Sequence, residues 1–150
     1  MRAIEAIAVI GAGNMGSGIA QKSAQEGFSV QMIDREQQWV DRGHKIIDEF
    51  LSEAIERRIF RPPDVELIRG RIEGVVGNEN VAPGTDLVIE AVFEDFEIKQ
   101  QVFSALDKAC EDHTILATNT SSLSVDALAE APGRPARFVA LHWFYPPAKN

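Results

Sequence analysis

The sequence is poor in cysteine, in long apolar runs and in basic residues. Cys110 is the single cysteine among 150 residues, so the chain can form neither an internal disulfide framework nor a metal site of several cysteines. The apolar run at residues 4–10 is too short for a membrane span and too quickly interrupted for the core of a signal peptide. We therefore expect a soluble, cytoplasmic protein without a metal centre.

Basic residues are outnumbered by acidic ones. The 15 Lys and Arg against 23 Asp and Glu give a net charge of −8 at pH 7, and no long basic run occurs. Such a charge disfavours a nucleic acid or an anionic membrane as the main partner. An anionic ligand would need local positive groups.

Strand-like and helix-like segments alternate along the chain. The predicted strands are Ala6–Ile10, Phe28–Ile33, Ile72–Val76, Leu87–Val92, Thr114–Ala117 and Phe138–Leu141. The predicted helices are Asn14–Glu26, Glu36–Ile59, Asp64–Arg69 and Glu97–Cys110, where apolar residues return every three to four positions. This alternation predicts one α/β domain over residues 1–150, with a doubly wound parallel sheet covered on both faces. The second and third helices form a pair inserted after the second strand.

A glycine-rich turn, Gly11-Ala-Gly-Asn-Met-Gly16, follows the first predicted strand and opens the first helix. In this setting backbone N–H groups and the helix dipole can bind a pyrophosphate. Gly11 would make the tight turn, Gly13 would let the backbone approach the phosphates, and Gly16 would allow close packing of helix on strand. The alternative is a glycine turn that joins a strand to a helix without a ligand.

An acid stands where a dinucleotide-binding sheet would hold the adenosine ribose. Asp34 ends the second strand, 23 residues after Gly11, and its carboxylate can accept hydrogen bonds from ribose hydroxyls and repel a 2′-phosphate. The sheet, the turn and Asp34 together predict a Rossmann-type fold that binds NAD. The neighbouring Arg35 is a feature that would favour NADP instead.

Polar residues follow the last three predicted strands. Glu94 and Lys99 follow the fourth strand, residues 119–122 follow the fifth, and His142 follows the sixth. Ligands of open parallel sheets bind beyond these strand ends. A nicotinamide along this edge would meet the hydroxyl of Ser121, which can hydrogen-bond a substrate oxygen, and His142, which can act as a base near neutral pH.

Each of these residues also has a structural interpretation. Residues 119–122, Ser124 or Asp126 could cap a following helix, and His142 could be a packed side chain beside Trp143. Other titratable residues are interpreted as a surface pair (Glu94 and Lys99), as solvated histidines (His44 and His113) and as a small core residue (Cys110).

Four segments, in order and at a characteristic spacing, resemble the NAD-binding domain of the L-3-hydroxyacyl-CoA dehydrogenases, including short-chain 3-hydroxybutyryl-CoA dehydrogenases. The likeness extends over essentially the whole chain. The segments are Val9–Ala20, Asp86–Val92 with Glu94 and Lys99, Ala117–Leu123, and Leu141–Phe144.

The resemblance implies reversible oxidation of a 3-hydroxyacyl-CoA to the 3-ketoacyl-CoA in fatty-acid β-oxidation, with hydride transfer to NAD. It makes His142 the catalytic base and Ser121 the residue that binds the substrate oxygen. It assigns cofactor binding to Gly11, Gly13, Asn14, Met15, Gly16, Asp34, Glu94, Lys99 and Asn119. It also places the helix pair of residues 36–71 against CoA, with phosphate contacts from Arg57, Arg58 and Arg61. Arginines near a helix end also favour the dipole and solubility without any ligand.

Two departures from the family pattern bear on activity. Tyr145 stands where the family usually has an asparagine that touches the cofactor, so cofactor placement or substrate choice could differ. The family's histidine is oriented by a glutamate further downstream, in front of a helical domain that completes the acyl pocket and forms the homodimer. This sequence ends at Asn150. Because loss of an orienting carboxylate can cost roughly 10²–10⁴-fold in rate, we expect these residues alone to bind NAD but to turn over poorly.

The leading hypothesis is therefore the NAD-binding domain of an L-3-hydroxyacyl-CoA dehydrogenase. The alternatives are a stand-alone NAD-binding module without catalysis and a related dehydrogenase of another 3-hydroxy acid.

Overall fold

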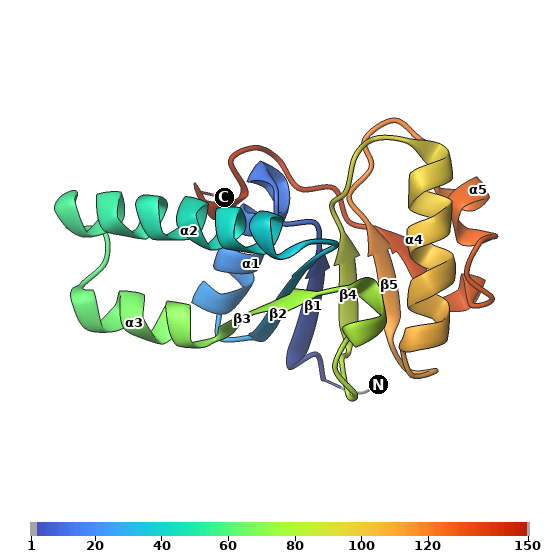
Figure 1. Ribbon diagram of the computed structural model, residues 1–150, viewed down its shortest axis with the longest axis horizontal. Coiled ribbons are helices and arrows are strands. Elements are labelled where there is room, and N and C mark those ends of the chain that lie inside the picture. Colours follow the sequence, from blue (N-terminus) through green and yellow to red (C-terminus); the bar gives the residue numbers. More distant parts are fainter. Residues whose placement is uncertain (1–2, 150) are drawn as a thin grey trace.

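Six parallel strands form one sheet in the computed structural model, which describes residues 3–149 (Figure 1). The strands are β1 (Ala6–Ile10), β2 (Ser29–Asp34), β3 (Ile72–Val76), β4 (Leu87–Glu90), β5 (Ile115–Thr118) and β6 (Phe138–Ala140). Their order is β3-β2-β1-β4-β5-β6, so the direction of winding reverses between β1 and β4. This order confirms the predicted doubly wound sheet of the Rossmann type.

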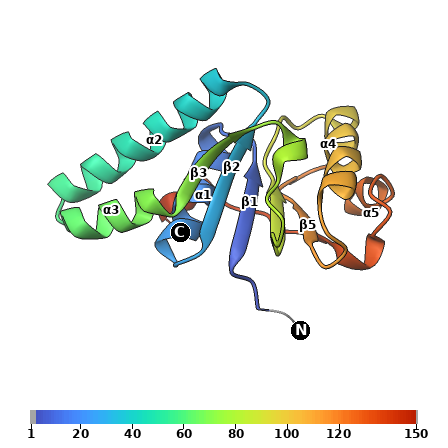
Figure 2. The ribbon, with the colours of Figure 1, turned by 60° about the horizontal axis from the view of Figure 1, so that its bottom comes forward.

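Helices cover both faces of the sheet. They are α1 (Asn14–Gln25), α2 (Gln37–Glu56), α3 (Pro62–Gly70), α4 (Phe96–Ala109) and α5 (Val125–Ala129), with short 3₁₀ turns η1 (Asn78–Asn80), η2 (Pro135–Arg137) and η3 (Pro147–Lys149). Helices α1, α2 and α3 pack in one half of the molecule and α4 and α5 in the other (Figures 1 and 2). The pair α2–α3 projects away from the sheet, as predicted for an insertion after the second strand.

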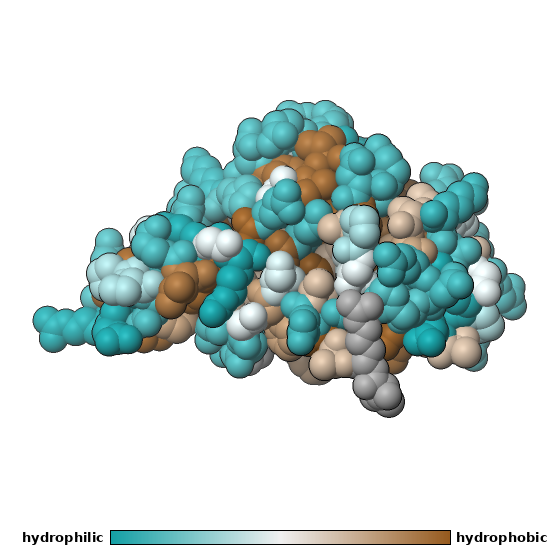
Figure 3. Space-filling view, turned by 90° about the horizontal axis from the view of Figure 1, so that it is seen from below, coloured by the Kyte–Doolittle hydropathy of each residue, from teal (hydrophilic) through white to brown (hydrophobic). Residues whose placement is uncertain are grey.

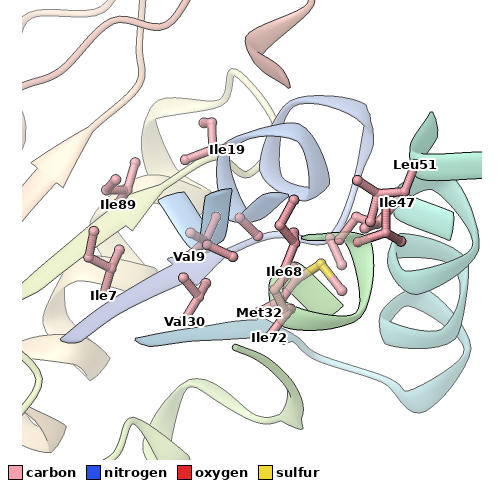
Figure 4. Close-up of a cluster of buried hydrophobic side chains, with 14 of the residues drawn as sticks. Ile7, Val9, Ile19, Val30, Met32, Ile47, Leu51, Ile68, Ile72 and Ile89 are labelled. Carbon is pink, nitrogen blue, oxygen red and sulfur yellow. The ribbon is translucent and has the colours of Figure 1, made fainter. Parts of the chain in front are cut away.

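The core has two layers because neighbouring residues of a strand point to opposite faces. Ile7 and Val9 of β1 join a cluster with α1, α2 and α3, whose packed side chains appear in Figure 4. Ala8 and Ile10 of the same strand join a second cluster, with Phe103 of α4. Burial on both faces explains the nearly continuous apolar sequence of the strands.

Several element ends differ from the predicted ones. Strand β4 ends at Glu90 rather than Val92, because the Glu90 side chain accepts the Val92 N–H at 2.8 Å and the chain turns there. Helix α3 begins at Pro62, since a first helical residue needs no N–H partner. Helix α5 was foreseen only as an alternative use of the polar residues after β5. Ser124 caps it by accepting the N–H of Ala127 at 3.2 Å.

Figure 3 shows the end of the molecule from which β1 starts, where hydrophilic side chains predominate around a hydrophobic area in the upper centre of the view. Within residues 3–149, no helix is long and apolar enough to cross a lipid bilayer. The same residues include no group of three or more His, Cys, Asp or Glu side chains that could hold a metal ion.

Arg134, in the connection before β6, binds the C-terminal end of α4. Its side chain is 12 % exposed, and its Nε donates to Oδ1 of Asp107 at 2.6 Å. Its other nitrogens donate to carbonyl oxygens at 2.6–3.5 Å, those of Asp107, Cys110, Glu111 and Thr114. The last carbonyl groups of a helix lack intrahelical donors, so the guanidinium of Arg134 supplies the missing hydrogen-bond donors at the end of α4. The hydrogen bond from Arg134 also holds the pKa of Asp107 below its ordinary value.

Replacing Arg134 by alanine should lower the free energy of unfolding by about 2–3 kcal/mol, because half-buried carbonyls and a carboxylate lose their donor. Urea denaturation at neutral pH measures the change. Arg137→Ala is the matched control, since Arg137 is exposed and its guanidinium donates to the carbonyl of His113 at 3.3 Å; it should cost less than about 0.5 kcal/mol. Equal losses in the two variants would contradict this role of Arg134.

The same pair predicts a pH dependence. Because the pKa of Asp107 is lower in the folded state, its contribution to stability is fully present above its ordinary value of 3.8 and is lost as the pH falls through the folded-state pKa. The stability difference between the native protein and Arg134→Ala should therefore shrink on acidification.

Candidate active site

The glycine turn between β1 and α1 is crowded at two glycines and open at the third. A side chain at Gly11, where φ is +103°, would place its Cβ 2.6 Å from the carbonyl oxygen of Ala91. A Cβ at Gly16 would lie 1.7 Å from the carbonyl oxygen of Gly11. At Gly13 no heavy atom other than those of the adjoining residues lies within 4 Å of that position. The turn is therefore closed toward the protein and open above Gly13, where a phosphate can approach.

The first turn of α1 opens beside Gly13. This glycine is the N-cap residue and supplies no side-chain hydrogen bond; Asn14 is exposed and Met15 is half-buried. The first N–H groups of a helix lack intrahelical partners, and the helix dipole adds partial positive charge. The turn thus has the donors and the space that a pyrophosphate requires.

Asp34 ties the end of β2 to the glycine turn. Its Oδ2 accepts the N–H of Ala12 at 2.8 Å, and its Oδ1 accepts the N–H of Arg35 at 2.7 Å. An ionised carboxylate has about four acceptor sites, so two are left for ribose hydroxyls. The side chain of Arg35 is 72 % exposed and has Glu36 as its neighbour, with Nε 3.7 Å from Oε1.

A buried ion pair lies under the end of β4. Oε1 of Glu90 accepts hydrogen bonds from Nζ of Lys99 at 2.6 Å and from the N–H of Val92 at 2.8 Å, and Oε2 accepts the hydroxyl of Thr118 at 2.8 Å. The side chains of Glu90 and Lys99 are 0 % and 1 % exposed. The interpretation of Lys99 as part of a surface pair is wrong, because α4 directs its ammonium into the protein against Glu90.

Glu94 connects this pair to the loop after β5. Its Oε2 lies 3.3 Å from Nζ of Lys99, and its Oε1 accepts hydrogen bonds from the hydroxyls of Thr120 and Ser122. Burial raises the pKa of Glu94, but the bond from Thr120, the charge of Lys99 and the bond from Ser122 outweigh it and lower the pKa below the ordinary value. An ionised Glu94 therefore holds both neighbours of the exposed Ser121.

Asn119 joins the loop after β5 to the segment after β6. Its Oδ1 accepts the N–H of Trp143 at 2.7 Å, and its own N–H donates to the carbonyl of Glu90 at 3.0 Å. Ser121 follows Asn119 in one segment, and His142 precedes Trp143 in the other; both are exposed. The structure thus brings the two predicted catalytic residues to one edge of the sheet, on segments joined by one side chain.

The segment after His142 runs back toward α1. Trp143 packs against the core cluster on the face of the sheet that α1 covers, and Pro147 is buried, 2.9 Å from where a Cβ on Gly18 would lie. In Figure 1 the C-terminal segment accordingly passes over the sheet to the side of α1. His142 is exposed and lies outside both core clusters; its ring is 4.9 Å from the ring of Phe144, and its neighbour Trp143 is half-buried.

Two of the three arginines predicted to contact phosphates, Arg57 and Arg61, are paired with carboxylates. Arg57 lies 2.6 Å from Glu53, and Nε of Arg61 lies 3.0 Å from Oδ2 of Asp64. The hydrogen bond between the latter two raises the pKa of Arg61 and lowers that of Asp64. A phosphate would have to compete with these partners, so the role of Arg57 in substrate binding stays a prediction.

Four residues of this network were not among the predicted site residues: Glu90, Thr118, Thr120 and Ser122. One signal was present in the sequence. A carboxylate inside the apolar run Leu87–Val92 of a buried strand requires a partner, and Lys99 follows within the first turn of the next helix.

Comparison with known proteins places the chain in a family. Residues 6–150 match the family model of the 3-hydroxyacyl-CoA dehydrogenase NAD-binding domain. The chain is 42 % identical over 139 residues to a probable 3-hydroxybutyryl-CoA dehydrogenase of Deinococcus radiodurans, and 36 % identical over 148 residues to the mitochondrial hydroxyacyl-coenzyme A dehydrogenase of Homo sapiens. It also resembles the crystal structure of (S)-3-hydroxybutyryl-CoA dehydrogenase from Ralstonia eutropha, with a TM-score of 0.92 and 33 % identity. The chain belongs to the 3-hydroxyacyl-CoA dehydrogenase family and is its NAD-binding domain.

The alignments cover 92 %, 95 % and 96 % of this chain, respectively, but the chain spans about half the length of these relatives: 49 %, 47 % and 50 %. The predicted family, fold and cofactor are confirmed. The individual residue roles stay predictions, including a contact of Lys99 with the cofactor, and so does the helical domain.

Gly13→Ala should leave the fold intact and weaken cofactor binding. The position has room for a methyl group and φ is −75°, so the free energy of unfolding should change by less than about 0.5 kcal/mol. The methyl group would occupy the phosphate position and lower NADH affinity by roughly tenfold or more, as followed by nicotinamide fluorescence. Gly16→Ala is the opposite case, because its Cβ overlaps the turn and should cost about 1–3 kcal/mol of stability. Unchanged NADH binding by Gly13→Ala would show that phosphates do not approach there.

Proposed function

We propose that this domain serves an enzyme that oxidises 3-hydroxyacyl-CoA thioesters reversibly to 3-ketoacyl-CoA, with NAD as hydride acceptor. The observation that carries the proposal is the hydrogen bond from Trp143 to Asn119, which joins the segments that carry Ser121 and His142. The names of the relatives, 3-hydroxybutyryl-CoA and hydroxyacyl-coenzyme A dehydrogenases, support the substrate class. The proposal concerns a protein that includes the part of these relatives lying outside this chain.

The exposed residues divide the chemistry between them. NAD, when bound, supplies the acceptor for the hydride that leaves the carbon bearing the hydroxyl group. The imidazole of His142 takes the hydroxyl proton, and it returns that proton in the reduction. The hydroxyl of Ser121 donates a hydrogen bond to the same oxygen and stabilises the charge that develops on it. Glu94, through Thr120 and Ser122, holds the loop that carries this hydroxyl.

Further parts of the proposal rest on the family and on composition. The exposed arginines at the tip of the α2–α3 pair, Arg57 and Arg58, supply positive charge for the CoA phosphates. A helical domain completes the acyl pocket and forms the homodimer. The enzyme acts in fatty-acid metabolism in the cytoplasm.

His142→Gln in the full-length enzyme should lower kcat for reduction of acetoacetyl-CoA by roughly 10²–10⁴-fold, because the proton donor is lost. The dissociation constant of NADH should change by less than about threefold, since the imidazole acts on the substrate. Absorbance of NADH gives the rate, and its fluorescence gives the affinity. His44→Gln, on α2, is the control and should keep the native rate.

Three outcomes would count against the proposal. Equal losses of rate and NADH affinity would make His142 a structural residue. Preference for free acetoacetate over its CoA thioester would favour a dehydrogenase of another 3-hydroxy acid. NADH binding without any turnover by the full-length protein would favour a binding module.

A further inference from the structure

Three charged side chains meet at the end of β4 and leave one negative charge in excess. Glu90 and Glu94 each contribute a carboxylate, and Nζ of Lys99 lies 2.6 Å from the first and 3.3 Å from the second. Among the ion pairs of residues 3–149, Lys99 is the only cation that contacts either carboxylate. We call this group the Glu90–Lys99–Glu94 cluster.

The buried Glu90 decides the net charge of the cluster. Without it, the ammonium of Lys99 would neutralise Glu94 and the sum would be zero. With it, Lys99 is compensated inside the protein, where both side chains are at most 1 % exposed. The charge of Glu94, whose side chain is 41 % exposed, is then left uncompensated at the surface of the site. Hydrogen bonds from Thr120 and Ser122 favour its ionised form.

The cluster lies in the nicotinamide half of the sheet. A dinucleotide crosses the switch point between β1 and β4, with its adenosine half on the side of β2, where Asp34 stands. Glu90 ends β4, and the next residue, Ala91, meets the glycine turn at Gly11. The other half of the dinucleotide therefore extends over the ends of β4 and β5, where Glu94 contacts the loop of residues 120–122.

We propose that the Glu90–Lys99–Glu94 cluster biases the site toward the oxidised form of the cofactor. The nicotinamide ring carries a positive charge in NAD⁺ and none once it has accepted a hydride, whereas the phosphates are unchanged. An excess negative charge near the ring therefore stabilises bound NAD⁺ relative to bound NADH. One unit charge within roughly 10 Å, in a dielectric between that of protein and water, changes this ratio on the order of fivefold. The inference rests on NAD binding and not on the substrate.

Glu94→Gln tests the proposal in the chain as it stands, by titration calorimetry with NAD⁺ and by fluorescence titration with NADH. Glutamine keeps an acceptor for Thr120 and Ser122 but brings the cluster to zero charge. The ratio of the NAD⁺ to the NADH dissociation constant should rise about fivefold, which for this two-electron couple raises the potential of the bound cofactor by about 20 mV. The rise should shrink at high salt, because Glu94 is partly exposed.

Two further variants separate charge from structure. Glu90→Gln with Lys99→Met removes both buried charges, leaves the excess at −1 and should keep the native ratio; such neutral replacements of buried pairs are often tolerated. Glu5→Gln removes an equal charge before the start of β1, at the opposite end of the sheet, and should also keep it.

The proposal is overturned if Glu94→Gln weakens both cofactor forms equally, because the carboxylate would then act by contact alone. It is also overturned if the double variant shifts the ratio as Glu94→Gln does. If the unaltered chain binds neither form, NAD binding itself fails, which is a different result. Thermal unfolding of each variant shows whether it is folded. If the double variant is unfolded, the comparison of Glu94→Gln with the Glu5→Gln control decides whether the proposal holds.

Discussion

A carboxylate buried at the end of a central strand determines how the site is assembled. Glu90 binds Lys99 of α4, Thr118 of β5 and the backbone that leaves β4, so three segments converge on one side chain. Isolated, this charge would be costly to bury, and each partner removes part of that cost. These contacts also position Ser121 indirectly. Lys99 lies beside Glu94, and Glu94 accepts hydrogen bonds from the residues on either side of Ser121.

The parts of the molecule that follow local rules could be predicted from the sequence. The strand, glycine turn and helix at the N-terminal end are set by neighbours in the chain, and Asp34 follows from the end of the next strand. Tertiary contacts are another matter. Glu90 in an apolar strand indicates that a partner is needed, but the burial of Lys99 against it depends on the pairing of β4 with β5 and on how α4 packs, which nearby residues do not determine. The same holds for the bond from Asn119 to Trp143.

The two halves of the sheet use different means to present a ligand site. On the side of β2, the site is formed mostly by backbone: the open space at Gly13 and the N-terminal end of α1. The Asp34 carboxylate completes it and also accepts the N–H of Ala12 in the glycine turn. On the side of β5, side chains of Glu94, Thr120 and Asn119 organise the loops. Backbone shape tolerates little substitution at a few positions, whereas a side-chain network couples many positions weakly. The phosphate end of the site is therefore built mainly from backbone, and the reactive end mainly from side chains.

The path of the chain after β6 bears on how freely His142 can move. Before His142, the N–H of Leu141 donates to the carbonyl of Thr118 in β5. One residue after it, the N–H of Trp143 donates to Asn119, and further on Pro147 packs against Gly18 of α1. His142 therefore lies in a short segment that contacts β5 and Asn119 on one side and α1 on the other. The position of the imidazole is therefore set by contacts to both β5 and α1, although His142 itself makes none of them.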